Sequence, residues 1–185
     1  AEIYMDPNGG YTPERAIEVA KVYRDNGVAL FEEPCPFWEI EQSAQVANAL
    51  EMPVAGGEQD TNLAQWRRIF AIGAVDVAQP DIGYIGGLSQ MLRVAEMARA
   101  HGKRCTPHTA NLSMLTVFGL HAMRIVPNGF EFLEFSIEST PWTDGLYDPA
   151  PRVVDGTVAV PEGPGWGVTI RRDWLDKATH QKSEK

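Results

Sequence analysis

The chain has 185 residues, of which 44% are hydrophobic and 22% are charged, a composition typical of a globular protein large enough to bury a core. Its formal net charge is -9, and no cluster of Lys and Arg is interleaved with aromatic residues, which argues against nucleic-acid binding. Only two cysteines, Cys35 and Cys105, are present, and no apolar run is long enough to cross a membrane, so we expect reduced thiols and a cytoplasmic protein.

Short apolar runs alternate with helical patterns along most of the chain. The sequence predicts strands over residues 2–6, 28–32, 53–57, 75–79, 104–107 and, less sharply bounded, around 130–134. Helices are predicted between them, over residues 13–25, 39–50, 62–72, 88–101 and 112–125. This alternation indicates six β/α units whose strands are parallel and whose crossovers are right-handed.

Local signals mark several helix ends. Thr12 followed by Pro13 is a favoured start, with Thr12 as the N-cap and Pro13 in the first turn. Asn26-Gly27 and Gly102 supply left-handed stops after the first and fourth helices.

The composition changes after Glu138. Proline and glycine recur from Pro141 to Gly167 and no long helical period survives, so residues 139–185 are predicted to form a loop-rich C-terminal segment that follows a β/α domain over residues 1–138. Residues 153–158 predict a hairpin with an Asp-Gly turn, and residues 177–185 are polar enough to fray.

Six units are fewer than the eight that close a β/α barrel. The predicted fold class is therefore α/β, a partial (β/α)8-type TIM barrel whose first strands would precede Ala1. A complete doubly wound domain is the alternative, but its first turn would carry a glycine-rich phosphate loop, and the turn at Pro7-Asn8-Gly9-Gly10 lacks that motif.

Ionisable residues recur at the C-terminal ends of successive predicted strands. They are Asp6, Glu32, Glu58 and Asp81, at near-regular intervals, followed by His108. Each one alone is compatible with an ordinary turn or helix cap. Their recurrence at the same place in every unit favours an active site, because the C-terminal strand ends of a β/α barrel meet at one face.

The residue types suggest two devices at this face. Asp6, Glu32 and Glu58 are three carboxylates without thiolates, a set that suits a hard cation such as Mg²⁺. Asp81 and His108 end consecutive strands, so the carboxylate could hold the imidazole tautomer and make His108 a general base. A lone histidine near a helix start remains the alternative interpretation of His108.

These residues, in this order, resemble the enolase superfamily and, within it, the mandelate racemase subgroup. The resemblance implies that Asp6, Glu32 and Glu58 bind Mg²⁺ and that Asp81 and His108 form a catalytic dyad. The subgroup related to muconate cycloisomerase instead has a lysine near Asp81, and this sequence has none there.

The resemblance also assigns substrate contacts. It implies that Glu134 is the acid that hydrogen-bonds the substrate carboxylate, with Glu131 and Glu138 as alternatives, and that Asn8 lines the site. The segment from Val158 to Val168 is similar to the family's C-terminal signature.

Members of this family have an N-terminal capping domain and a Lys-x-Lys motif on the second barrel strand. Both would lie before Ala1, so the resemblance implies that the chain is a fragment whose other partner is the N-terminal portion of the same protein. Residues 139–185 are then expected to pack on the barrel and on that capping domain, and family habit suggests a homo-oligomer.

The activity implied is removal of the proton α to a carboxylate through an enediolate intermediate that Mg²⁺ stabilises. Dehydration of an acid sugar is the preferred reaction, because such activities dominate the subgroup with a His–Asp pair. Two alternatives are a racemase or epimerase of a 2-hydroxy acid, whose opposing base would lie upstream of Ala1, and a non-catalytic metal-binding barrel scaffold.

Overall fold

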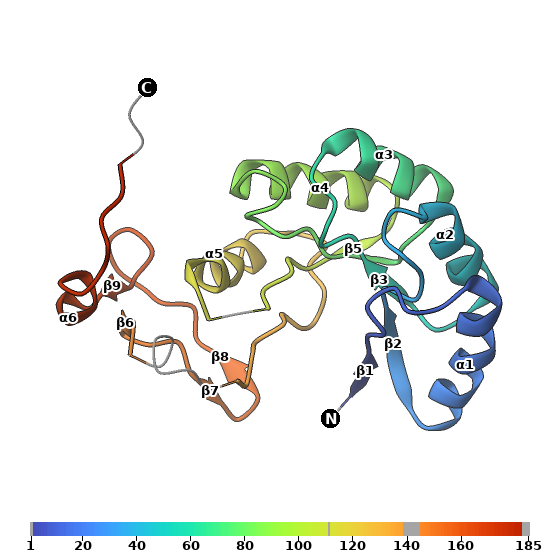
Figure 1. Cartoon of the computed structure of the whole chain (residues 1–185), viewed down its shortest axis with the longest axis horizontal. Coiled ribbons are helices and arrows are strands. Elements are labelled where there is room, and N and C mark those ends of the chain that lie inside the picture. The colour runs from blue at the N-terminus through green and yellow to red at the C-terminus, as the bar shows by residue number, and fades with distance from the viewer. Residues whose placement is uncertain (1, 111, 139–144, 183–185) are drawn as a thin grey trace.

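The computed structural model of the chain describes residues 2–110, 112–138 and 145–182 (Figure 1). Its centre is a five-stranded sheet in which every neighbouring pair is parallel and the order follows the chain, β1-β2-β3-β4-β5. The strands are β1 (Ile3–Met5), β2 (Val28–Glu32), β3 (Val54–Gly56), β4 (Val77–Ala78) and β5 (Arg104–Cys105). The first five predicted strands are therefore confirmed, and the sequential order rules out a doubly wound topology for them, which would reverse direction within the sheet.

A helix follows each of these strands. The five are α1 (Pro13–Asp25), α2 (Ile40–Ala49), α3 (Leu63–Ile72), α4 (Leu88–Ala100) and α5 (Met114–Met123). Figure 1 shows α1 to α4 as a curved row along one side of the sheet, the arrangement that right-handed crossovers produce. The predicted cap at Thr12 is confirmed, since its side chain accepts a hydrogen bond from the Arg15 backbone N–H.

The prediction of a sixth strand is wrong: the structure describes residues 130–134, and they form no strand. The pairing of this segment with β5 is a single parallel bridge between Cys105 and Gly129. Beyond the bridge a side chain replaces the backbone ladder, because Thr106 Oγ1 donates to the Phe132 carbonyl oxygen at 3.0 Å. The fold thus has the sheet of an α/β barrel, while closure into a full barrel stays a prediction.

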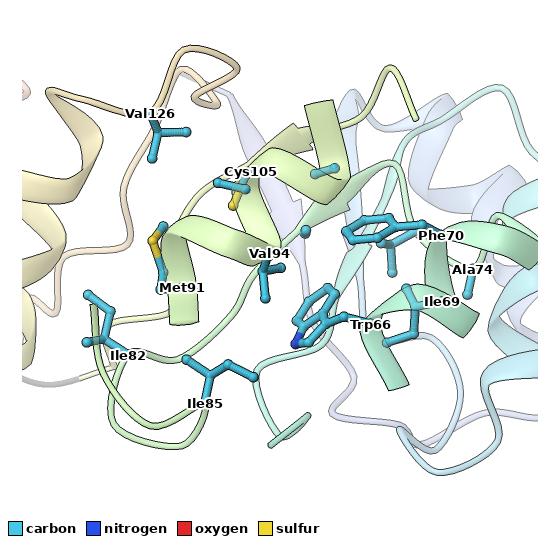
Figure 2. Packing of buried hydrophobic residues seen from close by; sticks show 14 of the residues in the cluster. Trp66, Ile69, Phe70, Ala74, Ile82, Ile85, Met91, Val94, Cys105 and Val126 are labelled. Carbon is cyan, nitrogen blue, oxygen red and sulfur yellow. The ribbon is translucent and has the colours of Figure 1, made fainter. Parts of the chain in front are cut away.

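The helix side of the sheet holds most of the core. Trp66, Ile69 and Phe70 of α3 pack with Met91 and Val94 of α4 in the largest cluster (Figure 2). A second cluster joins α1 and α2 to β2 and β3, through Ala16, Ala20, Phe31, Cys35, Val46 and Val54. Burying each large apolar side chain contributes about 1.5–3 kcal/mol, so these contacts fix the strands relative to the helices.

We call the opposite side of the sheet the inner side. It buries far fewer apolar residues than the helix side does. Its apolar cluster is Leu30, Ala55 and Val77, with Tyr4 and Phe130 packed against it. Because side chains alternate along a strand, Leu30 faces the inner side while its neighbour Phe31 faces the helices.

Within residues 145–182, the described part of the predicted C-terminal segment, regular structure is short. Two short antiparallel pairs, β6 (Tyr147–Asp148) with β9 (Thr169–Ile170) and β7 (Val153–Val154) with β8 (Thr157–Val158), precede a single helical turn, α6 (Arg172–Leu175). The β7–β8 hairpin and its Asp-Gly turn are confirmed, with positive φ angles of 50° at Asp155 and 77° at Gly156.

Some sequence-based expectations lie outside the described residues. Pro141 falls within residues 139–144, and the end of the polar tail falls within residues 183–185. The division of the chain at residue 138 stays a prediction. Both cysteines are buried free thiols, and within the described part of the chain no helix is long and apolar enough to cross a bilayer.

Candidate active site

Strand alternation carries a set of polar side chains to the inner side. Residues two positions apart on a strand face the same way, so the residue two places after an inner apolar side chain also points inward, beyond the strand end. The pairs are Tyr4 with Asp6, Leu30 with Glu32, Val77 with Gln79 and Thr106 with His108, and all of these residues line one cavity of about 520 Å³. Phe132 and Glu134 line the same cavity from the segment beside β5 that forms no strand.

Glu58 reaches the same cavity through a glycine turn. Gly56 and Gly57 end β3 with positive φ angles of 157° and 101°. A Cβ atom at Gly57 would lie 2.3 Å from the ring of Trp66, so no larger residue fits there without displacing the indole. The packing of Trp66 against this turn therefore fixes where Glu58 leaves the strand.

Asp81 and His108 form the predicted pair. The two residues are bridged in parallel, and Asp81 Oδ2 lies 3.0 Å from His108 Nδ1. The other oxygen, Asp81 Oδ1, accepts hydrogen bonds from the backbone N–H groups of Gly83 at 2.7 Å and Tyr84 at 2.9 Å. Burial tends to raise the pKa of Asp81, but the hydrogen bonds from His108 and from these backbone groups outweigh it and lower the pKa. Asp81 is therefore an ionised, fixed acceptor for Nδ1–H.

The second nitrogen of His108 faces the cavity. Nε2 lies 3.2 Å from Glu58 Oε2 and 3.7 Å from Glu134 Oε2. Burial lowers the pKa of His108, yet the hydrogen bond to Asp81 and the charges of Glu58 and Glu134 raise it to about 9. With Nδ1 held by Asp81, Nε2 is the atom through which His108 can exchange a proton with a molecule in the cavity.

The three predicted metal ligands share this cavity but are each engaged by a neighbour. Both oxygens of Asp6 accept from Asn8, from the backbone N–H at 2.7 Å and from Nδ2 at 2.8 Å. Glu32 Oε1 accepts from Gln79 Nε2 at 2.9 Å. Within the described residues, no three His, Cys, Asp or Glu side chains are arranged to hold a metal ion. The predicted ligands are thus brought together without forming a preassembled cluster.

The electrostatics of this set nevertheless fit a cation. Burial, followed by the charges of Asp6 and Glu134, raises the pKa of Glu32 to about 8. Burial also raises the pKa values of Asp6 and Glu58, and neighbouring carboxylates add to both shifts. Buried carboxylates that repel one another are stabilised by a positive ion, and oxygen donors without thiolates suit a hard divalent one.

The structure separates the three acids considered for substrate binding. Glu134 lines the cavity, and its Oε2 accepts from the Thr109 backbone N–H at 3.0 Å. Glu131 instead pairs with Arg104 at 3.0 Å, and neither it nor Glu138 lines the cavity. Asn8 does line it, although its amide is turned to Asp6.

Sequence reasoning missed Gln79, which is buried at the cavity and bound to Glu32. A signal was present, because Gln79 lies two residues after Val77 and so on the same side of the sheet. It also missed Glu33, whose carboxylate lies on the other side of β2, buried, with burial the first cause of a pKa raised to about 7.

Curated relatives match nearly the whole chain. Over 181 residues it is 32% identical to D-galactarolactone cycloisomerase of Agrobacterium fabrum, a match that covers 94% of this chain and 48% of that enzyme. It is 29% identical over 170 residues to arabinonate dehydratase of Saccharolobus solfataricus, with 92% and 45% covered. The chain therefore spans about half the length of the curated relatives it matches.

Solved structures agree with this grouping. A "putative racemase" from Roseobacter denitrificans superposes with a TM-score of 0.95 at 48% identity, covering 100% of this chain and 52% of that one. A "putative L-alanine-DL-glutamate epimerase" from Burkholderia xenovorans, bound to magnesium and fumarate, gives a TM-score of 0.82 at 26% identity and covers 93% and 42%. A family profile described as Enolase C-terminal domain-like matches residues 1–174. As the resemblance to the enolase superfamily predicted, the chain belongs to this enolase C-terminal domain-like family.

Proposed function

We propose that the intact protein removes the proton α to a carboxylate and, through an enediolate, dehydrates an acid sugar. The observation that carries the proposal is the position of His108, whose Nδ1 is held by Asp81 while its Nε2 faces the cavity beside Glu58 and Glu134. The choice of dehydration is supported by relatives named arabinonate dehydratase and L-talarate/galactarate dehydratase.

In this proposal Asp6, Glu32 and Glu58 hold Mg²⁺. The ion would supply positive charge for the negative charge that develops on the substrate carboxylate. The donor set is oxygen-only, and the raised pKa of Glu32 fits a site completed by a cation. The Burkholderia structure, which is described as containing magnesium and fumarate, supports both the metal and the class of ligand.

The chain's own residues divide the remaining work. With the carboxylate charges that raise its pKa offset by a bound cation, His108 is a neutral imidazole that takes the α-proton at Nε2, while Asp81 holds Nδ1–H and stabilises the resulting imidazolium. That proton then goes to the departing β-hydroxyl, which leaves as water. Glu134, which lines the cavity beside His108 Nε2, contacts the substrate carboxylate. Tyr4, Leu30 and Phe130 form an apolar floor beneath these groups, and a volume of about 520 Å³ suits a small carboxylate.

Racemisation or epimerisation of a 2-hydroxy acid is the second candidate. It is favoured by the 48% identity to the Roseobacter protein described as a racemase. That reaction needs a base on the opposite face of the substrate, and among the described residues that line the cavity His108 is the only imidazole and no lysine is present. A base from elsewhere in the intact protein would have to complete the site.

The test is proton exchange in deuterated solvent. The intact protein with Mg²⁺ is expected to exchange the α-proton of acid sugars or 2-hydroxy acids, and His108→Asn is expected to reduce that exchange at least 100-fold. The matched control is His180→Asn, because His180 is exposed in the C-terminal tail and should leave the rate unchanged.

The products separate the candidates. Loss of water from the exchanging substrate supports the dehydratase, whereas exchange with inversion and no loss of water supports the racemase. If no hydroxy acid exchanges its α-proton while Mg²⁺ still raises thermal stability, a non-catalytic scaffold is the better account. Exchange that is unaffected in His108→Asn would remove His108 as the base.

The remaining partners follow from the same proposal. A small carboxylate is the expected partner. Homo-oligomerisation and a cytoplasmic location stay predictions.

A further inference from the structure

Gln79 has a buried side-chain amide and belongs neither to the Asp81–His108 pair nor to the set of predicted metal ligands. It follows β4, is 7% exposed and lines the inner cavity. Its Nε2 donates to Glu32 Oε1 at 2.9 Å, across a sequence separation of 47 residues. Since the strand order is β2-β3-β4, this hydrogen bond spans the strand that lies between the two residues.

The intervening strand has room for that contact. At this level β3 contributes Ala55, followed by Gly56 and Gly57, the smallest side chains available. The Gln79 amide turns its nitrogen to Glu32 Oε1, so its oxygen points elsewhere.

The oxygen of the Gln79 amide, Oε1, is buried and has no hydrogen-bond partner among the described residues. A buried acceptor without a donor destabilises a fold, and methionine would fill a similar volume without that cost. Packing therefore does not account for glutamine at this position, whereas the contact that its nitrogen makes with Glu32 does.

We propose that Gln79 is a positioning residue that orients Glu32 for cation binding, an inference that rests on the proposed function. The amide holds one carboxylate oxygen, Oε1, and leaves Oε2 to face the ion. Asn8 plays a comparable part for Asp6, but from two residues away in the same turn, so only Gln79 acts across the sheet.

Mg²⁺ binding to the intact protein, measured by titration calorimetry with the metal alone, tests this role. Gln79→Met is expected to weaken Mg²⁺ binding at least tenfold. Its urea midpoint should match or exceed that of the unaltered protein, because a buried unpaired acceptor has been removed. Gln79→Asn keeps the amide on a shorter side chain that cannot reach Glu32, so it should lose affinity as well.

Val94→Ala is the control for a loss of stability alone. Val94 is fully buried on α4, on the helix side of the sheet, so its truncation should lower the urea midpoint and leave Mg²⁺ affinity unchanged. Unchanged affinity in Gln79→Met and Gln79→Asn, with normal binding by the unaltered protein, would overturn the role of Gln79 and leave the proposed function standing. Absence of Mg²⁺ binding by the unaltered protein would overturn both.

Discussion

The two sides of the sheet are built on opposite principles. The helix side buries large apolar residues such as Trp66, Phe70 and Met91 in continuous clusters. Among the described residues, the apolar cluster on the inner side has three buried members, Leu30, Ala55 and Val77, and carboxylates line the cavity above them. The difference shows that the helix side stabilises the fold, whereas the like charges held together on the inner side destabilise it.

Removal of a large side chain from the helix side should cause the largest loss in the free energy of unfolding. Trp66 is fully buried and packs against Phe70, with ring centroids 5.5 Å apart. We expect Trp66→Ala to lower the free energy of unfolding by about 3–5 kcal/mol, as measured by chemical denaturation. A loss below about 1 kcal/mol would contradict the assignment of the helix side as the stabilising one.

Gly57 joins the two sides, and its substitution should damage both. Gly57→Ala places a Cβ atom 2.3 Å from Trp66 and forces alanine into a φ angle of 101°. The expected loss is about 2–3 kcal/mol of stability together with weaker Mg²⁺ binding, because the turn carries Glu58. The mild substitution Gly27→Ala is a control, since nothing lies within 4 Å of its Cβ position although its φ angle is also positive.

On the inner side, neutralising a carboxylate should stabilise the metal-free protein. The folded state holds the proton of Glu32 up to a pKa of about 8, whereas the unfolded state releases it near the ordinary value of 4.5. The folded state then binds more protons between these values, so its stability falls as the pH rises from 4.5 to 8.

Glu32→Gln removes this penalty. In buffer with a chelator, we expect the variant to be more stable than the unaltered protein at pH 8, by about 1 kcal/mol or more, and to lose the advantage near pH 4.5. Denaturation series at several pH values measure the difference. Equal stability at pH 8 would mean that Glu32 carries no electrostatic penalty.

The last prediction needs no substitution and concerns the reactivity of the two thiols. Burial raises the pKa of Cys35 to about 11 and that of Cys105 to about 12. Both should react with an alkylating reagent at least 100-fold more slowly in the native protein than in urea, because less thiolate is present and access is blocked. Rapid labelling of Cys105 in the native state would show that the helix side opens more readily than its packing indicates.

Sequence patterns predicted five strands and five helices because apolar periodicity and caps such as Thr12 are local signals. The sixth strand failed because an apolar, aromatic run does not ensure a backbone ladder, and here the Thr106 side chain makes the contact instead. Pairing depends on the neighbour as well as on the segment itself.

The candidate site divides in the same way. The strand-end rule predicted that Asp6, Glu32, Glu58, Asp81 and His108 would come together, and four of them line the cavity while Asp81 is hydrogen-bonded to His108. Glu134, which the family resemblance indicated, lines the same cavity from a segment that is not a strand. The donors that orient them were not predictable to the same extent. The contact between Gln79 and Glu32 depends on side-chain reach across a third strand, which no spacing along the chain encodes.

A crystal structure of the intact protein grown with Mg²⁺ tests the central claim most directly. The account predicts one ion bound by oxygens of Asp6, Glu32 and Glu58, at the C-terminal ends of β1, β2 and β3. The ring of His108 should still be hydrogen-bonded to Asp81. An ion bound elsewhere, or none at these three carboxylates at saturating Mg²⁺, would contradict it.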